Sequence, residues 1–187
     1  MTKEELKLNI EKLSYDYLCQ DIEALDIVGH SKSHITWDLM KDMFDWNGKK
    51  VADLGCFHGY YSFKVEQAGA LDVTGFDRSP NILAVTQDIR DLQKSCINLK
   101  QWELGQEVSD YYDIALLLCV LRYAPDKDLA IRNIKCQYLL CDVDDPEIQV
   151  VGKHFVILKR KTSWGISQRN GIGNLMLCER KHYNESN

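Results

Sequence analysis

Short apolar segments alternate with amphipathic ones along most of the chain. The apolar segments read KVADL, LDVTGFD, CINLKQWEL, YDIALLLCVL and QYLLCDV, and each has the length of a single strand. Strands that are apolar throughout are buried on both faces, as in a parallel sheet covered by helices. Alternation of strands and helices at this spacing produces βαβ units. The pattern therefore predicts an α/β fold with a doubly wound, mostly parallel sheet.

Local signals mark helices between the predicted strands. Residues 59–68 form one predicted helix, which Gly69 ends. Ser79 followed by Pro80 is a strong helix start, because serine caps the first turn and proline is tolerated at its first position. A short further helix is predicted over residues 125–134.

The two ends of the chain depart from this alternation. Thr2 and Glu5 form a capping box for a first helix, and Ser33 is expected to cap a second one. The apolar positions at helical spacing are Leu6, Ile10, Leu13 and Tyr17 in the first helix, and Ile35, Leu39, Met40 and Met43 in the second. Residues 1–47 are thus predicted as a helical extension of a core formed by residues 48–187. HFVILKRK and NLMLCER predict a C-terminal β-hairpin, which brings the expected sheet to seven strands.

Length and composition limit the class of protein. A chain of 187 residues with 27% charged and 45% hydrophobic residues suits one soluble globular domain. No apolar run is long enough to cross a membrane, and the charged N-terminus lacks an apolar signal core. We therefore expect a single cytoplasmic domain over residues 1–187, without membrane contact.

The charge is unevenly distributed. Residues 1–150 carry 16 Lys and Arg against 26 Asp and Glu, whereas residues 151–187 carry 7 against 2. A strongly basic nucleic-acid binder would have a different balance, and we expect no DNA partner. The basic C-terminal part suits either an anionic substrate or a solvated strand edge.

Seven cysteines are scattered along the chain without a CxxC pair. They are Cys19, Cys56, Cys96, Cys119, Cys136, Cys141 and Cys178. Several lie in apolar runs, where a thiol packs as a small hydrophobic group. The spacing predicts free thiols and no metal site.

The chemistry of an open α/β sheet lies at the carboxyl ends of its strands, where ligands bind. After the first predicted strand, Gly55 permits a tight turn, and Gly59 lets the next helix pack close to the strand. Asp77 ends the second strand, 24 residues after Asp53. An acid at that place accepts hydrogen bonds from the ribose hydroxyls of a nucleoside cofactor.

Asp53 narrows the choice of nucleoside. A dinucleotide or a triphosphate would place phosphate near this carboxylate, which would repel it, and the chain has no P-loop Lys-Ser/Thr pair. S-adenosylmethionine carries an ammonium, a sulfonium and no phosphate. The loop therefore favours S-adenosylmethionine as the cofactor.

The stretch VADLGCFHGYYSFKVEQAGALDVTGFD resembles motifs I and II of class I S-adenosylmethionine-dependent methyltransferases. YYDIALLLCVLRYAPD is similar to the fourth-strand motif of that family, QYLLCDV to its fifth strand, and the terminal hairpin to its sixth and reversed seventh strands. The resemblance spans residues 48–181. Within the family, GYYSF and the following GA most resemble the group that contains tRNA wobble-uridine methyltransferases.

The resemblance implies a Rossmann-like methyltransferase fold and a set of site residues. The loop residues Asp53, Gly55, Cys56, Phe57, His58 and Gly59 would hold the methionine part of the cofactor, Asp77 and the adjoining Arg78 the ribose, Trp102 or Glu103 the adenine, and Cys119 the edge toward the acceptor. Phe57 departs from the family pattern, which usually has glycine there. Its cost depends on whether the backbone takes a positive φ at this position. His58 suits either the methionine pocket or a partly exposed place at the helix start.

The acceptor side is less defined. Tyr123 and Arg122 are the candidate catalytic residues, Tyr123 by positioning an acceptor hydroxyl and Arg122 by clamping an acidic group. The alternative for Tyr123 is deprotonation of that hydroxyl, and the alternative for Arg122 is a pair with a surface carboxylate. Further candidates, each with a structural alternative, are His30, His34 and Trp37 in a lid, Trp164 and Arg169 at the pocket edge, and Asp142 after the fifth strand. No histidine stands in VLRYAP, which mildly favours an acceptor that is already anionic or an amine.

Three functions stay open on these grounds. The first, which is the main prediction, is a methyltransferase that acts on a small molecule or a sugar. The second is a methyltransferase that acts on a short RNA segment such as part of a tRNA. The third is a non-catalytic protein that binds the cofactor or serves a structural role.

Overall fold

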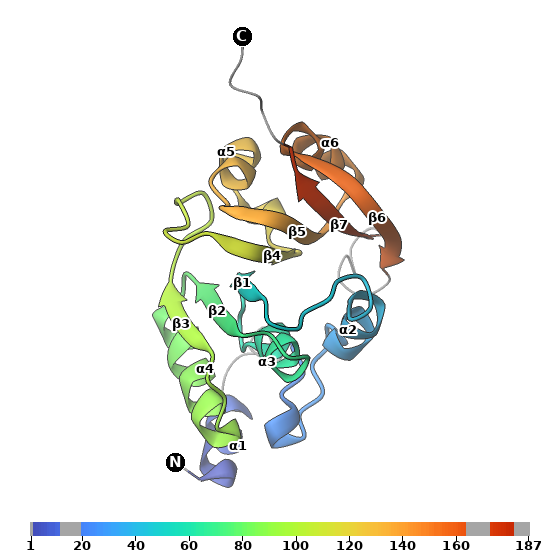
Figure 1. Cartoon of the computed structure of the whole chain (residues 1–187). Coiled ribbons are helices and arrows are strands. Elements are labelled where there is room, and N and C mark those ends of the chain that lie inside the picture. Colours follow the sequence, from blue (N-terminus) through green and yellow to red (C-terminus); the bar gives the residue numbers. More distant parts are fainter. Residues whose placement is uncertain (1, 12–19, 164–172, 182–187) are drawn as a thin grey trace.

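The computed structural model describes residues 2–11, 20–163 and 173–181, and within them seven strands form one sheet (Figure 1). The order across the sheet is β3-β2-β1-β4-β5-β7-β6. The strands are β1 (Lys50–Leu54), β2 (Asp72–Asp77), β3 (Asn98–Gln101), β4 (Tyr112–Leu118), β5 (Cys136–Val143), β6 (Phe155–Ser163) and β7 (Gly173–Arg180). All pairs among β1 to β5 are parallel, and β7 runs antiparallel between β5 and β6. The predicted doubly wound sheet with a C-terminal hairpin is confirmed.

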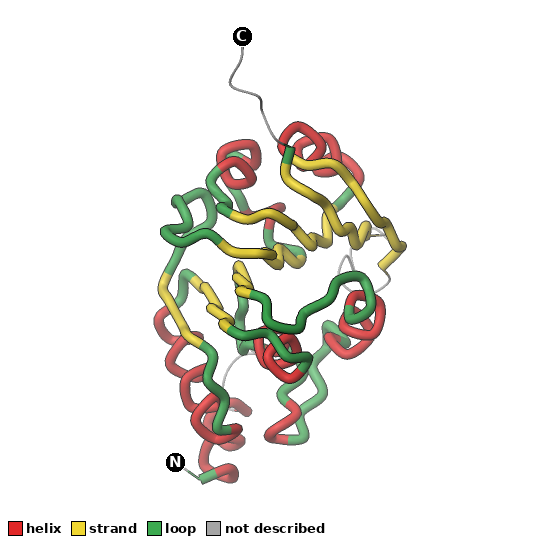
Figure 2. The backbone as a smooth tube through the Cα atoms, in the orientation of Figure 1, coloured by secondary structure: helices red, strands yellow, loops and turns green. Residues whose placement is uncertain are grey.

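Helices cover both faces of this sheet (Figures 1 and 2). The helices are α1 (Lys3–Glu11), α2 (Ser33–Met40), α3 (Tyr60–Gln67), α4 (Pro80–Gln93), α5 (Lys127–Arg132) and α6 (Asp145–His154), with short 3-10 turns η2 (Glu23–Leu25) and η3 (Leu121–Tyr123). One buried cluster joins the sheet to α5 and α6, and the other joins it to α1, α2, α3 and α4. No helix in the described ranges has both the length and the apolar character that crossing a bilayer requires.

Strand β4 shows why its sequence is apolar throughout. Ile114 and Leu116 belong to the cluster beneath α3 and α4, whereas Ala115 and Leu117 belong to the cluster beneath α5 and α6. All four side chains are fully buried. Successive side chains of a strand point to opposite faces, so both faces of this central strand must be apolar.

Several predicted element boundaries change in the structure. The predicted third strand shortens to Asn98–Gln101, and the second helix ends at Met40, so Met43 is buried in the turn that follows. Helix α6 was not predicted at all, although Asp144 and Glu147 form a capping box around its start. The capping box of Thr2 and Glu5 is present at α1. Leu13 and Tyr17 lie outside the described residues.

The predicted cap of the second helix is wrong. Ser33 is the first helical residue, and Lys32 occupies the N-cap position. Lys32 has a left-handed φ of 50°, and its side chain makes no capping hydrogen bond. The backbone N–H of His34 is instead satisfied by Asp21, 13 residues earlier in the chain. A long-range carboxylate thus replaces the local hydroxyl that the sequence pattern indicated.

Candidate functional site

The turn after β1 is fixed against the neighbouring strand. The backbone N–H groups of Gly55 and Cys56 both donate to the carbonyl of Phe76 at 2.8 Å. Gly55 has a φ of +80°, and a Cβ added there would lie 2.6 Å from Cγ1 of Val120. Only glycine fits this close approach between the ends of β1 and β4.

Phe57 occupies a left-handed backbone conformation, with a φ of +51°. The position therefore does demand the conformation that a glycine adopts without strain. Two hydrogen bonds hold it there: its N–H donates to Oδ2 of Asp77 at 3.1 Å, and its carbonyl accepts from Oγ1 of Thr86 at 2.8 Å. The loop after β1 is thus tied to the end of β2 and to α4.

Asp77 lies at the end of β2, and its carboxylate can accept more hydrogen bonds than the two that it accepts in the structure. Its Oδ2 accepts from Phe57, and its Oδ1 accepts from the N–H of Ser79 at 3.0 Å. An ionised carboxylate has about four lone-pair positions, so about two remain for a ligand. A pair of neighbouring ribose hydroxyls, each donating one hydrogen bond, requires two such acceptor positions.

A hollow of about 210 Å³ opens beside Asp77 at the ends of β2 and β3. It is lined by Arg78, Gln101, Trp102, Glu103 and Gln106. Trp102 is buried, its ring packs edge-on against Phe76, and its Nε1–H donates to the carbonyl of Gln106. Three of the residues predicted to flank the ribose and the adenine therefore meet in one hollow, which has an aromatic wall.

Asp53 lies beneath the loop. It is 2% exposed, and Ser62 on α3 donates a hydrogen bond to its Oδ2 at 2.6 Å. Burial raises the pKa of the Asp53 carboxyl to about 6. The hydrogen bond from Ser62 joins β1 to α3, so Asp53 supports the base of the loop.

His58 is fully buried, contrary to the alternative of a partly exposed helix-start residue. Within the described part of the chain, neither of its ring nitrogens has a hydrogen-bond partner. Burial lowers the pKa of this imidazole to about 4, so the ring is neutral. Phe57 lies next to it, with ring centroids 4.2 Å apart.

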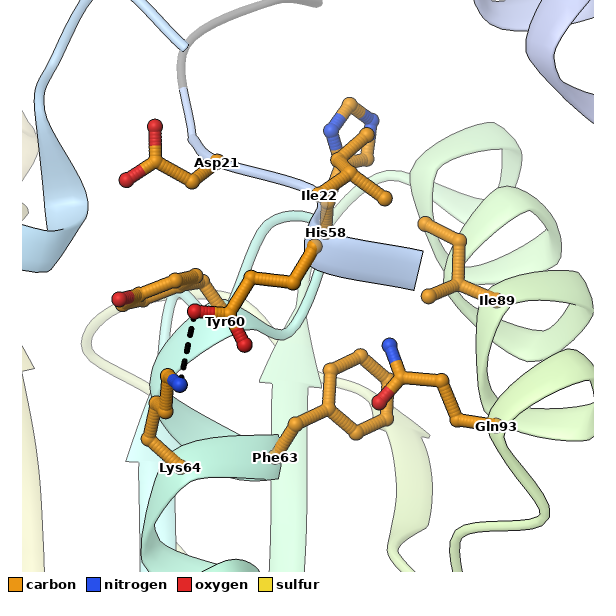
Figure 3. A pocket seen from close by; sticks show the side chains of 9 residues that line it. Asp21, Ile22, His58, Tyr60, Phe63, Lys64, Ile89 and Gln93 are labelled. Atoms are coloured by element: carbon orange, nitrogen blue, oxygen red, sulfur yellow. Dashed lines mark ion pairs between the residues drawn. The ribbon is translucent and has the colours of Figure 1, made fainter. Parts of the chain in front are cut away.

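A small cavity adjoins His58 between α3, α4 and the segment before η2 (Figure 3). Its lining comprises Asp21, Ile22, Glu23, His58, Tyr60, Phe63, Lys64, Ile89 and Gln93. Two of these lining residues, Lys64 and Glu23, form an ion pair at 2.7 Å. The cavity has a volume of about 10 Å³, which is enough for one water molecule and for no larger ligand.

The two cysteines assigned to the site are poor nucleophiles in this environment. Burial raises the pKa of both Cys56 and Cys119 well above the ordinary value of a thiol. Cys119 has a φ of +62° directly after β4, and its N–H donates to the carbonyl of Asp142. The strand ends of β4 and β5 are joined there, so Cys119 marks the far border of the predicted cofactor groove.

The predicted catalytic pair lies on η3, the 3-10 turn after β4. Tyr123 is 73% exposed. Arg122 reaches Oδ1 of Asp144 at 3.5 Å, which is the carboxylate pairing that the sequence left as an alternative. Trp164 and Arg169 lie outside the described residues. Among the residues that the structure describes, no group of three or more His, Cys, Asp or Glu side chains is placed to bind a metal ion.

Several residues at this edge were not singled out from the sequence. Ser62 and Thr86 support the loop, and Gln101 and Gln106 line the hollow. Ser62 and Thr86 lie within the first two turns of their helices, where a hydroxyl group does not by itself indicate a functional role. Only the packing of these helices against β1 and its loop reveals their role.

Comparison with known proteins assigns this geometry to a family. A protein-family model described as a methyltransferase domain matches residues 52–142, which include the loop, Asp77 and the hollow. Residues 52–142 of the chain are thus similar to a methyltransferase domain. Its fold is that of solved methyltransferases: the magnesium protoporphyrin IX methyltransferase from Synechocystis PCC 6803 with bound S-adenosylmethionine is 20% identical, with a TM-score of 0.68 over 96% of this chain and 97% of that one. A putative S-adenosylmethionine-dependent methyltransferase from Listeria monocytogenes is 16% identical, with a TM-score of 0.65 over 81% and 100%.

Several curated relatives of this chain carry one recurring name. The tRNA U34 carboxymethyltransferase of Campylobacter hominis is 32% identical over 108 residues, which are 56% of this chain and 37% of the relative. The protein of that name from Helicobacter pylori strain G27 is 33% identical, and the match covers 41% of its length. The matched stretch thus spans little more than a third of each relative.

Proposed function

We propose that this protein is a methyltransferase that uses S-adenosylmethionine and acts on tRNA. The observation that carries the cofactor assignment is the hydrogen bond from the loop residue Phe57 to Asp77, beside the hollow walled by Trp102. In the proposed complex, the loop after β1 would hold the methionine part, Asp77 the ribose and the hollow the adenine.

The residues present fit this cofactor. Asp77 keeps free lone pairs for ribose hydroxyls, and the hollow offers an apolar wall to a planar base. The acid Asp53 lies under the loop, where a phosphate would be repelled and a cationic tail would be favoured. When bound, S-adenosylmethionine supplies an activated methyl carbon, and the protein contributes mainly the alignment of donor and acceptor.

The names of the relatives favour RNA over the small molecule or sugar that the sequence first favoured. Eight curated relatives share the name tRNA U34 carboxymethyltransferase. The edge strand β6 adds three consecutive exposed cations, Lys159, Arg160 and Lys161, to the otherwise acidic chain. Such a short basic strip suits a few phosphate contacts rather than a long duplex. We place the reaction in the cytoplasm, where tRNA is found.

All three cations already make contacts within the fold. Arg160 donates to Oδ1 of Asn174 at 2.9 Å and forms an ion pair with Asp145 at 3.5 Å, so part of its charge is neutralised. Lys159 donates to the carbonyl of Met43 at 2.9 Å, and Lys161 donates to the carbonyl of Leu39 at 2.7 Å. Their charges are not cancelled by these neutral partners. We therefore expect weak tRNA binding that falls as salt rises, with a slope set by only a few phosphates.

The decisive experiment is transfer of radiolabelled methyl groups from S-adenosylmethionine to total tRNA. Asp77→Ala and heat-inactivated protein serve as controls. Incorporation that depends on Asp77 supports the proposal. Calorimetric binding of S-adenosylmethionine without incorporation would favour a cofactor-binding protein or a small-molecule acceptor, and no binding at millimolar cofactor would refute the cofactor assignment.

A further inference from the structure

A buried aspartate holds a histidine at the start of α2. The Asp21 carboxylate is 6% exposed and accepts three hydrogen bonds: from the N–H of Gly29 at 2.8 Å, from the N–H of His34 at 2.9 Å and from Nδ1 of His34 at 2.8 Å. The His34 side chain is 52% exposed. One end of this imidazole is fixed inside the protein while the other faces solvent.

The contact determines which ring nitrogen carries the proton. An ionised carboxylate can only accept hydrogen bonds, so Nδ1 of His34 must be the donor. In the neutral ring, Nε2 then holds a free lone pair. This is the arrangement in which a carboxylate orients a histidine as a proton acceptor.

The contacts of α2 with β6 show which end of the sheet the helix adjoins. Lys161 of β6 lies level with the end of β5 and bonds the carbonyl of Leu39 in the last turn of α2, whereas Lys159 lies two positions earlier and bonds Met43 in the turn after the helix. The chain from Leu39 to Met43 therefore runs away from the carboxyl edge, and α2 with His34 precedes it on the side of that edge.

Contacts also join this turn to the cofactor loop. Gln20, next to Asp21, accepts a hydrogen bond from the N–H of Tyr60, the residue after Gly59. Asp21 itself lines the small cavity together with His58 and Tyr60. Asp21 and His34 thus lie close to the loop after β1.

We propose that His34 is the general base of the methyl transfer and that Asp21 is the residue that positions it, an inference that rests on the proposed function. The acceptor is then a group that carries a proton on its nucleophilic atom, such as a hydroxyl. The sequence favoured an anionic or amine acceptor because no histidine directly follows β4. His34 lies elsewhere in the chain and supplies the base that such a position lacks.

Each bond that forms in the methyl transfer is matched by one that breaks. The acceptor O–H gives its proton to Nε2 of His34, and the oxygen uses the freed electron pair to form the bond to the methyl carbon. The carbon–sulfur bond breaks with its electrons on sulfur, which becomes a neutral thioether. The imidazolium formed on His34 is stabilised by Asp21 and then releases its proton to solvent.

His34→Ala tests the base, and a similar pair far from the site provides the control. His154 at the end of α6 contacts Asp128 through Nε2 at 3.2 Å, so His154→Ala also removes a histidine paired with an aspartate. We expect His34→Ala to slow methyl transfer to total tRNA by at least about 100-fold and to be partly rescued by added imidazole. Calorimetric affinity for S-adenosylmethionine should stay unchanged in both variants, and His154→Ala should transfer normally.

A rate close to that of the wild type in His34→Ala, or a loss that imidazole does not reverse, would overturn the proposal. A wild-type protein that transfers nothing to tRNA would instead contradict the proposed function. The nitrogen-15 spectrum of His34 then decides separately. A proton on Nδ1 that is lost in Asp21→Asn supports the orienting pair, and a proton on Nε2 in the neutral ring overturns it.

Discussion

The N–H of Phe57 and Oδ2 of Asp77 lie 3.1 Å apart and join the loop after β1 to the end of β2. The bond forms because Phe57 adopts a φ of +51°, which turns its amide toward the neighbouring strand end. Asp77 therefore has two tasks: it holds the loop in place, and it offers its remaining lone pairs to a ligand. A phenylalanine at a glycine-like position is thus built into the candidate site.

The left-handed conformation of Phe57 should appear as a stability difference between two small substitutions. Phe57→Gly and Phe57→Ala both remove the ring, but only glycine adopts this φ without strain. We expect the glycine variant to be more stable by about 0.5–1 kcal/mol, after allowance for the greater freedom of glycine in the unfolded chain. Urea unfolding of both variants checks this, and equal midpoints would contradict the strain.

Asp77→Ala should weaken the binding of S-adenosylmethionine. Loss of hydrogen bonds to a charged acceptor costs about 1.5–3 kcal/mol, which corresponds to about a ten- to hundredfold rise in Kd. Asp72, at the opposite end of β2, offers a matched control, since Asp72→Ala removes a carboxylate far from the hollow. Calorimetric titration of both variants measures the effect. An unchanged Kd in Asp77→Ala would show that the acid of the second strand does not bind the ribose.

The buried Asp53 should make stability depend on pH. Its pKa in the folded protein is about 6, against an ordinary value of 3.8, so the folded state binds this proton more tightly than the unfolded state. The resulting stabilisation is complete below pH 3.8 and is lost as the pH rises through 6. Asp53→Asn keeps an acceptor for Ser62 and removes the titration. Relative to this variant, the wild type should lose about 3 kcal/mol of unfolding free energy between pH 4 and 7. Parallel pH profiles would contradict it.

His58 should act in the same pH interval with the opposite sign. Burial lowers its pKa from 6.5 to about 4, so the stability that it contributes is present above pH 6.5 and is lost as the pH falls through 4. The contributions of Asp53 and His58 therefore offset each other in the wild type. His58→Leu removes only the second one. We expect the unfolding free energy of this variant, relative to the wild type, to be higher at pH 5 than at pH 8, and no difference between these values would contradict a buried neutral histidine.

Much of the fold follows from local patterns. The alternation of apolar segments with helices, the start signal at Ser79 and Pro80, and the terminal hairpin are all present in the structure. Helix α6 was not predicted, although Asp144 and Glu147 provide a capping box at its start. The cap of α2 was wrong because a distant carboxylate took the place of Ser33.

The sequence by itself determined the order of strands and helices and the types of residue that end β1 and β2, because both depend on neighbours in the chain. Burial on two faces selects apolar strands, and a tight turn selects glycine. The tertiary structure alone decided the positive φ of Phe57, the burial of His58 and the pairing of Asp21 with His34. Each of these depends on groups far apart in the sequence whose hydrogen bonds and desolvation are set only when the elements pack together.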